Sequence, residues 1–249
     1  MSESQVYLVT GASKGLGRSI CETLATNGFT VIGIARNSIE LSSLENYLKN
    51  INPKSATFAC DLSSENQIAL TANKITNDFP LIHGLIHNAG IIGPVGSMFN
   101  VKTNLWNETI QVNLLAVQQL TKLLYPSMVN AQRCRVTTIS SGAAVNSLES
   151  WSAYCTSKAG LEMWTRSLAD EGSSHGISAV SVAPGIVDTD MQATIRSVSV
   201  DDFPMVERFI GFHNNGDLVA PDVVADSLYE LITNHSMDDS GNRFDVREL

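Results

Sequence analysis

Short apolar runs alternate with longer amphipathic stretches along almost the whole chain. A short run rich in apolar and β-branched residues predicts a strand, whereas apolar residues recurring every three to four positions predict a helix. The predicted strands are 5–10, 29–35, 55–60, 81–88, 135–140 and 177–183, with a short edge strand near 242–246. The predicted helices are roughly 15–27, 38–50, 64–78, 103–130, 152–174 and 221–234. This alternation favours an α/β fold, in which helices cover both faces of a mostly parallel sheet.

One connection in this pattern is unusually long. Residues 190–216 follow the strand predicted at 177–183 and mix Asp201, Asp202 and Pro204 with a few apolar residues. A long segment beyond the carboxyl end of a strand is a candidate cover for a substrate. The chain contains no internal repeat, low-complexity tract or Gly/Ser linker. We therefore expect a single domain over 1–249, with 190–216 as its substrate-covering segment.

Composition and charge narrow the class of protein. The chain is 43% hydrophobic and 16% charged, as is typical of a globular domain, and its net charge of −9 disfavours nucleic acid or acidic membranes as partners. No apolar run approaches the roughly 18 residues of a membrane span, and the N-terminus does not resemble a signal peptide. The cysteines and histidines show no metal-binding or disulfide spacing. We expect a cytoplasmic protein without a metal.

A glycine-rich turn, TGASKGLG, follows the first predicted strand directly and contains Gly11, Gly15 and Gly17. Glycines at a strand–turn–helix junction allow a tight turn and bring backbone N–H groups close to a pyrophosphate at the helix N-terminus. The Walker pattern is absent, because no Gly-Lys-Ser/Thr follows. The turn therefore predicts a dinucleotide site.

The end of the second strand indicates which dinucleotide is bound. An NAD site usually has a carboxylate there for the ribose 2′-hydroxyl, but this chain has Arg36 between Ala35 and Asn37. Arg36 and Lys14 would both attract a 2′-phosphate, so NADP(H) is the predicted cofactor. Asp61, after the third strand, either accepts a hydrogen bond from the adenine amino group or caps the following helix.

The candidate chemistry lies in SSGAAVNSLESWSAYCTSKAG, residues 140–160. Tyr154 and Lys158 are four residues apart, so on a helix their side chains lie on one face. A nearby ammonium stabilises tyrosinate, and we expect it to lower the phenol pKa toward neutrality. Ser141 precedes the helix and would hydrogen-bond a substrate oxygen. Three polar groups converging on one oxygen suit the reversible reduction of a carbonyl.

These motifs together resemble the short-chain dehydrogenase/reductase family from end to end. The matching motifs are Thr10 to Gly17, Asn88-Ala89-Gly90, Asn113 in QVNLLA, the set Ser141, Tyr154 and Lys158, and Pro184-Gly185 leading to Thr189. The resemblance implies a Rossmann-type, doubly wound sheet and an NADP(H) site. Its implied cofactor contacts are Gly11, Ser13, Lys14, Gly15, Leu16, Gly17, Arg36, Asp61, Leu62, Asn88, Ala89, Gly90, Tyr154, Lys158, Pro184, Gly185, Val187 and Thr189.

The same resemblance implies individual roles in catalysis. Asn113 would bind a water through its backbone and connect Lys158 to solvent. Lys158 would also hold the nicotinamide ribose, and Thr189 the nicotinamide carboxamide. The segment 88–90 would support the adenosine ribose side of the cleft.

Two C-terminal segments resemble a narrower group. Residues 183–192 and the ending SGNRFD (240–245) are similar to sepiapterin reductases and to benzil-type diketone reductases. In the former the matching aspartate anchors the pterin, so Asp245 is a candidate substrate residue with Ser141 and Tyr154. The alternative is that Asp245 is a solvated charge at a sheet edge.

We therefore expect an NADPH-dependent reductase of a ketone or 1,2-dicarbonyl compound. The alternatives are an NADP-dependent alcohol or steroid dehydrogenase and a non-catalytic NADP(H) sensor. Several apolar residues lie on more than one face of helices 103–130 and 152–174, and relatives pair these helices with a second copy. A homodimer is expected, with a tetramer possible, through Trp106, Leu114, Leu115, Val117, Leu120, Leu161, Met163, Trp164 and Leu168.

Overall fold

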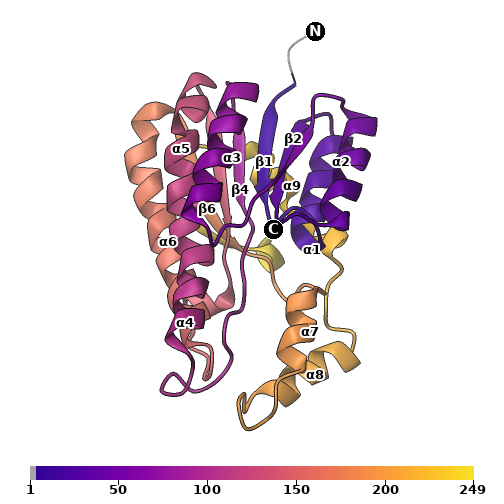
Figure 1. Cartoon of the computed structure of the whole chain (residues 1–249), viewed down its shortest axis with the longest axis vertical. Helices are drawn as coiled ribbons and strands as arrows, with labels where there is room; N and C mark the ends of the chain where they lie inside the picture. The colour runs from indigo at the N-terminus through magenta and orange to yellow at the C-terminus, as the bar shows by residue number, and fades with distance from the viewer. Residues whose placement is uncertain (1–3) are drawn as a thin grey trace.

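The computed structural model describes residues 4–249, and within that range seven strands form one sheet (Figure 1). The strands are β1 (Val6–Thr10), β2 (Thr30–Ala35), β3 (Ala56–Ala59), β4 (Gly84–His87), β5 (Cys134–Ile139), β6 (Ile177–Ala183) and β7 (Arg243–Asp245). Their order is β3-β2-β1-β4-β5-β6-β7, and each neighbouring pair is parallel. The predicted α/β class, the parallel sheet and the short edge strand are confirmed.

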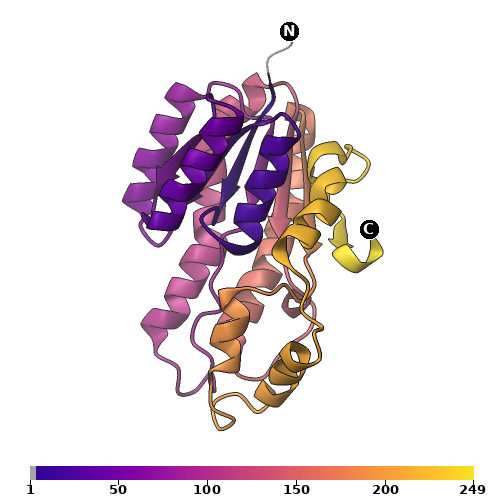
Figure 2. The same ribbon diagram turned by 90° about the vertical axis from the view of Figure 1, so that its right-hand side faces the viewer.

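Helices cover both faces of the sheet. They are α1 (Gly15–Thr26), α2 (Ile39–Ile51), α3 (Glu65–Asp78), α4 (Thr103–Ile110), α5 (Ala116–Asn130), α6 (Ser152–Gly172), α7 (Asp190–Arg196), α8 (Val206–Asn214) and α9 (Pro221–Asn234). Helices α1, α2 and α9 pack on one face, and α3, α5 and α6 on the other (Figures 1 and 2). None of the helices within residues 4–249 is long and apolar enough to cross a membrane.

The central strands are buried along almost their whole length because helices cover both faces of the sheet. All residues of β2, β5 and β6 are buried. Tyr7 and Val9 of β1 face the core under α1 and α9, whereas Leu8 faces the core under α3 and α5. The central strands therefore give two cores, one on each side of the sheet.

The sheet order places the site. β1 lies between β2 and β4, so the chain reverses its direction of winding between β1 and β4. At such a switch point the connections leave on opposite faces, and a crevice forms outside the carboxyl ends of the strands. The glycine turn follows β1 at this edge, and residues 88–90 follow β4.

The structure departs from the predicted helices in two places. The helix predicted at 103–130 is interrupted by a π-helical turn, η1 (Gln111–Leu115), which separates α4 from α5. An apolar period near 3.6 does not distinguish a π turn from an α turn, because one inserted residue alters it only locally. The segment 190–216 contains α7 and α8, too short to predict from their pattern, and it projects below the sheet (Figure 2).

Candidate functional site

Helix α6 carries two ionisable side chains into the interior at the carboxyl edge of the sheet. Tyr154 and Lys158 lie on one face of α6, and the Lys158 Nζ is 5.7 Å from the centroid of the Tyr154 ring. Both side chains are buried, with 7% and 3% of their surfaces exposed. The spacing of four residues thus brings the phenol and the ammonium together.

The Lys158 ammonium is held by the end of β5. Its Nζ donates a hydrogen bond to the Ile139 carbonyl oxygen at 2.8 Å. Burial lowers the Lys158 pKa to about 8, against the opposing effect of the Glu162 carboxylate. The lysine is therefore close to its titration point at neutral pH, where it can respond to its surroundings.

The Tyr154 phenol does not have the lowered pKa that the sequence suggested. Burial raises the Tyr154 pKa to about 12, although hydrogen bonding by Ser141 acts in the opposite direction. The expectation was wrong because desolvation of the phenolate outweighs the neighbouring groups. The phenol is consequently protonated at neutral pH, ready to donate its proton.

Ser141 lies two residues after β5 and is the N-cap of the short 3₁₀ helix η2 (Gly142–Ala144). Its Oγ accepts a hydrogen bond from the Ala143 backbone N–H at 3.1 Å. This bond fixes the hydroxyl oxygen, so that its hydrogen is free to point toward Tyr154 or a substrate oxygen. Ser141 and Tyr154 thus converge from two elements.

Asn113 lies in the π-helical turn η1 and is completely buried. Its Oδ1 accepts from the Ile91 N–H at 2.9 Å, and its Nδ2 donates to the Ile91 carbonyl at 2.9 Å and to Ser157 Oγ at 3.0 Å. The side chain therefore joins the loop after β4 to α6. Gly90 lies next to both groups, since a Cβ there would be 3.4 Å from Asn113 Oδ1 and 3.5 Å from Lys158 Nζ.

The glycine turn is closely packed against the loop after β4. A Cβ on Gly17 would lie 2.3 Å from the Gly11 carbonyl oxygen and 2.4 Å from Asn88 Nδ2, so only glycine fits there. Asn88 Nδ2 donates to the Thr10 carbonyl at 2.9 Å, and Thr10 Oγ1 accepts from the N–H groups of Asn88 and Ala89 at 3.1 Å. Asn88 and Ala89 therefore fix the conformation of the glycine turn through their hydrogen bonds to Thr10.

The N-terminus of α1 suits an anion. Helices α2 and α3 are capped by Ser38 and Ser64, whose side chains accept from the first helical turns. Lys14, at the N-cap of α1, makes no side-chain cap hydrogen bond with any described residue. The first N–H groups of α1, which follow the glycine turn directly, are therefore left without a side-chain acceptor and could bind the pyrophosphate of a dinucleotide. The residues present fit such a cofactor.

The groups predicted at the adenosine end lie around this turn. Arg36 is exposed just after β2, the strand whose Ile34 carbonyl accepts from the Ala12 N–H of the glycine turn at 3.1 Å. Lys14 forms an ion pair with Asp190, the first residue of α7, and so joins the glycine turn to the segment 190–216. Asp61 Oδ1 accepts from the N–H and hydroxyl of Ser63 at 2.9 and 2.8 Å. The alternative that Asp61 caps α3 is wrong, because Ser64 does so.

The remaining predicted cofactor residues surround the same crevice. Gly185, two residues after β6, has a φ of +74°, a conformation that favours glycine. Val187 pairs with Val219 in an isolated bridge, and the Thr189 Cγ2 would lie 3.2 Å from a Cβ on Gly15. The loop after β6 therefore contacts the glycine turn. The other predicted residues at these positions are Ser13, Leu16 and Leu62 in or beside the βα turns, and Pro184 after β6.

Asp245 is held by its own neighbour. It ends β7, and its Oδ1 accepts from the backbone N–H of Arg247 at 3.1 Å and from Arg247 Nε at 2.7 Å. The Arg247 guanidinium holds the Asp245 pKa at about 2, so the carboxyl is ionised. Asp245 is 7% exposed, so the alternative of a solvated charge is wrong.

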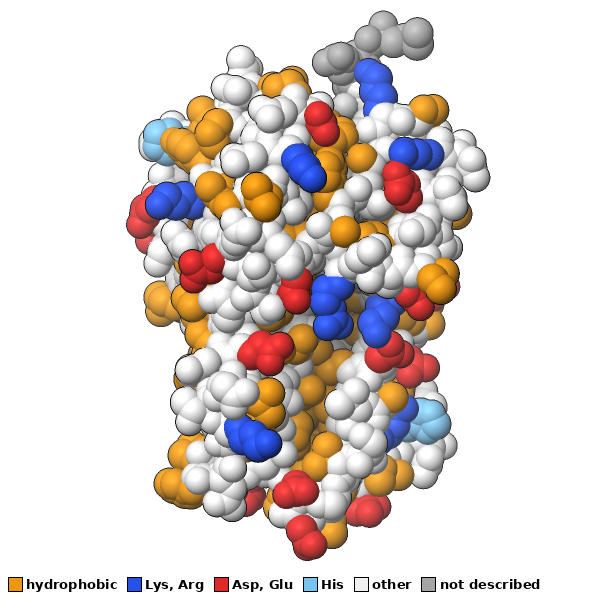
Figure 3. Space-filling model, viewed as in Figure 1, with side chains coloured by type: hydrophobic (Ala, Val, Ile, Leu, Met, Phe, Trp, Pro, Cys, Tyr) orange, Lys and Arg blue, Asp and Glu red, His pale blue; other side chains and the backbone are white. Residues whose placement is uncertain are grey.

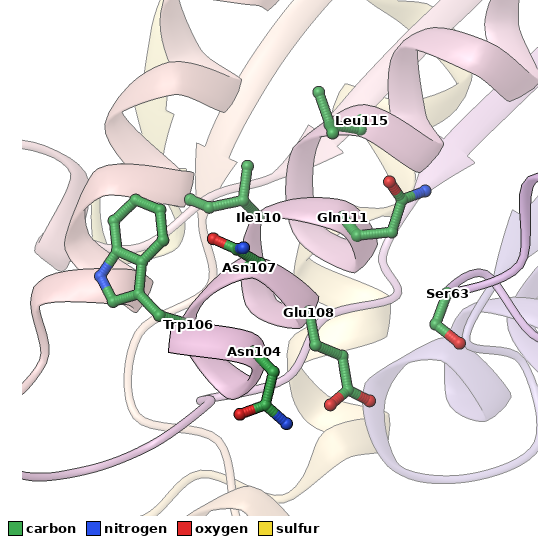
Figure 4. Close-up of a pocket in the computed structure, with 8 residues that line it drawn as sticks. All are labelled: Ser63, Asn104, Trp106, Asn107, Glu108, Ile110, Gln111 and Leu115. Atoms are coloured by element: carbon green, nitrogen blue, oxygen red, sulfur yellow. The ribbon is translucent and has the colours of Figure 1, made fainter. Parts of the chain in front are cut away.

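The surface shows where a substrate could enter. Figure 3 shows a hollow lined by hydrophobic side chains between α4 and the arm formed by α7 and α8, with Lys and Arg side chains at its upper end. On the outer side of α4, a separate pocket is bordered by Glu108 and Gln111, which project toward Ser63 (Figure 4). That pocket borders the predicted adenine end. Residues 4–249 contain no cluster of three or more side chains that could hold a metal ion.

Two features were missed by the sequence analysis. An aromatic cluster surrounds Tyr154, in which the Trp151 ring lies 5.7, 5.4 and 5.3 Å from the rings of Tyr154, Phe203 and Phe209. The second feature is Glu162, a buried carboxylate one helical turn beyond Lys158. Its spacing of four from Lys158 was a usable signal, whereas nothing local indicates that Phe203 and Phe209 reach Trp151.

Known proteins similar to this chain include one family, several relatives and several solved structures. The family described as short chain dehydrogenase matches residues 5–199. Benzil reductase ((S)-benzoin forming) of Bacillus subtilis is 32% identical over 98% of this chain and 99% of its own length. The crystal structure of KRED1-Pglu superposes with a TM-score of 0.88 at 31% identity, covering 96% of this chain and 100% of that one. A variant of actinorhodin polyketide ketoreductase with NADPH gives 0.85 at 26% identity, covering 98% and 95%.

The chain therefore belongs to the short-chain dehydrogenase family, as its motifs suggested. It is an oxidoreductase with a Rossmann-type fold, and the family uses NAD(P)(H).

The buried lysine should make the protein less stable than an uncharged variant at neutral pH. Burial lowers the Lys158 pKa from 10.5 to about 8, so the charged form disfavours folding below pH about 8, and this penalty disappears above the unfolded pKa. We expect Lys158→Met to raise the free energy of unfolding at pH 7 by roughly 1–3 kcal/mol. This range already subtracts about 1 kcal/mol for the Ile139 carbonyl, which loses its hydrogen-bond donor. Urea unfolding at pH 7 and pH 10.5 measures the difference. An advantage that does not shrink at pH 10.5 would contradict this account.

Proposed function

We propose that this dehydrogenase is an NADPH-dependent carbonyl reductase of apolar ketones, with 1,2-diketones as its preferred substrates. The observation that carries the proposal is the arrangement of Ser141, Tyr154 and Lys158 at the carboxyl edge of the sheet. With its raised pKa, Tyr154 is protonated at neutral pH and can serve as the acid that carbonyl reduction needs. The similarity to a benzil reductase supports an aromatic diketone.

The reaction adds a hydride to the carbonyl carbon and a proton to its oxygen. A reduced nicotinamide cofactor supplies the hydride when it is bound in the crevice. Tyr154 would donate its phenolic proton to the substrate oxygen, and Ser141 would hydrogen-bond the same oxygen. Lys158 would stabilise the phenolate that remains, through its positive charge. The Asn113 side chain would hold α6 against the loop that follows β4. Its backbone would bind the water that returns a proton to Tyr154.

The surroundings of Tyr154 support an apolar substrate. Trp151, Phe203 and Phe209 form one cluster with the catalytic ring, and Phe203 and Phe209 come from the segment 190–216. We propose that this segment covers the substrate. The pterin alternative is weaker, because both carboxylate oxygens of Asp245 are engaged by Arg247.

The preference for NADP(H) over NAD(H) rests on charge. Arg36 is exposed beside the glycine turn, and Lys14 is at the N-cap of α1. A guanidinium after β2 would pair with a 2′-phosphate in two hydrogen bonds. The carboxylate that usually binds an NAD ribose is replaced by Arg36 itself.

We propose a homodimer, with a tetramer possible, but with a smaller interface than the sequence suggested. Val117, Leu120 and Leu161 are buried in the chain's own core, so they need no second copy. Leu115 and Met163 remain exposed, by 49% and 59%. A cytoplasmic location is also proposed, because the four cysteines, all within residues 4–249, are free thiols.

Tyr154→Phe should abolish most of the reductase activity. The variant keeps the ring and loses the proton donor, so we expect kcat for reduction of benzil to fall on the order of 10²-fold or more, with little change in NADPH affinity. Absorbance of NADPH during turnover and fluorescence titration measure the two quantities. Tyr125→Phe, at an exposed position on α5, is the control. Near-normal turnover of Tyr154→Phe, or a wild-type protein inactive on every ketone and diketone tested, would refute the proposed function.

Arg36→Ala should affect the two cofactors differently. Removing the guanidinium takes away a partner of the 2′-phosphate, so we expect KM for NADPH to rise about tenfold or more, and KM for NADH to change little. Steady-state kinetics with both cofactors provide the measurement. Arg133→Ala, an exposed arginine before β5, removes the same charge far from the crevice. Equal changes for NADPH and NADH would show that Arg36 does not bind the phosphate.

Met163→Glu should dissociate the proposed dimer. A carboxylate at the centre of an apolar contact loses hydration without gaining a partner, so we expect the mass to fall from dimer to monomer. Light scattering after size exclusion gives the mass. Leu70→Glu, at an exposed position on α3, should leave the dimer intact. A wild-type monomer at all concentrations would exclude the assembly.

A further inference from the structure

Glu162 is a buried carboxylate for which the reaction described above has no use. Only 4% of the residue is exposed, and glutamate is almost never fully buried unless it is paired. Its Oε1 accepts from Ser140 Oγ at 2.6 Å and from Arg243 Nε at 2.7 Å. The carboxylate is thus fixed by one neutral and one charged donor.

The position of Glu162 ties it to the catalytic lysine. Lys158 and Glu162 are one turn apart on α6, and they bond to consecutive residues of the chain, Ile139 and Ser140, at the end of β5. Ser141 follows immediately. The two contacts together therefore fix the catalytic face of α6 against the strand end that presents Ser141.

Charge adds to this geometry. The Glu162 carboxylate opposes the lowering of the Lys158 pKa by burial, and among the described residues it is the charged group that acts on this lysine. Elements β6, η1 and η2, which pack against α6, carry no titratable side chain in their described residues. Tyr154 faces Lys158 from α6 itself and is protonated at neutral pH. Arg243 approaches from β7 and competes with Lys158 for the carboxylate.

The remaining packed elements carry a few titratable residues that do not affect Lys158. They are Glu108 on α4, His175 on the 3₁₀ turn after α6, and Cys134 and Arg135 at the opposite end of β5. The local field at Lys158 is therefore set by Glu162 and, through it, by Arg243.

We infer that Glu162 is a positioning residue for the reduction: held by Ser140 and Arg243, its carboxylate keeps Lys158 charged beside Tyr154. The effect on catalysis rests on the proposed function, but the effect on Lys158 does not. A purely structural alternative is that Glu162 only fastens β7 to α6 through Arg243. The two explanations differ in what they predict for the lysine.

The direct test is the titration of Lys158 itself, without cofactor or substrate. Protein labelled with ε-¹³C lysine is titrated by NMR, and Lys158→Arg assigns the signal. Glu162→Gln keeps the size and the acceptor for Ser140 but removes the charge, so the Lys158 titration should move to lower pH by about one unit or more. Glu162→Asp should restore much of the wild-type value. Glu171→Gln, exposed near the end of the same helix, is the control and should change nothing.

A second variant gives a change of opposite sign. Arg243→Gln removes the competing cation and leaves Glu162 charged, so the Lys158 titration should move to higher pH. General loosening of the structure would shift both variants in the same direction. If Glu162→Gln leaves the Lys158 titration at the wild-type pH, or if Arg243→Gln moves it to lower pH, the inference is wrong. Should Glu162→Gln fail to fold, the Arg243→Gln titration decides alone.

The consequence for catalysis is a change in the pH profile. Loss of the ammonium at high pH removes the group that stabilises the phenolate, so kcat/KM for reduction falls as pH rises through the Lys158 titration. In Glu162→Gln this fall should occur at lower pH, and the loss of rate should be larger at pH 9 than at pH 6. An equal loss at both pH values would contradict the inference. A wild-type protein without reductase activity would refute the proposed function, while the NMR titration would still test the role of Glu162.

Discussion

The site depends on one buried ammonium. The hydrogen bond from Lys158 to the Ile139 carbonyl fixes α6 to the end of β5, and α6 carries Tyr154 while β5 leads into Ser141. A buried ammonium is costly, because it leaves water for a region of low polarity. The protein offsets this cost with a carbonyl dipole and with Glu162. A buried lysine at this cost is consistent with a role in catalysis, in which its positive charge stabilises the Tyr154 phenolate.

The parallel sheet explains why so many separate motifs meet at one place. Each strand delivers its following residues to the same edge, so the glycine turn after β1, Asn88 after β4 and Ser141 after β5 all lie at one edge of the sheet although they are far apart in sequence. The close approach is strict at Gly17, where any side chain would collide with the Gly11 carbonyl. Packing within the turn thus requires glycine at position 17 whether or not a cofactor is bound.

Local patterns in the sequence identified the strands, the main helices and the meeting of Tyr154 with Lys158, because periodicity and short spacing act within one element. They did not predict that the Tyr154 pKa is raised. The direction of this shift depends on the burial of the phenol in a cluster that includes Phe203 and Phe209, about fifty residues further along the chain. The bond between Glu162 and Arg243 was hidden for the same reason. It requires β7 to pair with β6, and no local property of either residue specifies that pairing.

The short edge strand therefore has a role out of proportion to its length. β7 has three residues and pairs only with β6 among the described strands, so its backbone hydrogen bonds add little to the stability of the sheet. Its position nevertheless brings Arg243 to a buried carboxylate that also faces the lysine of the site. Arg243 competes with Lys158 for this carboxylate, so the C-terminal strand influences the charge of Lys158 without touching the substrate.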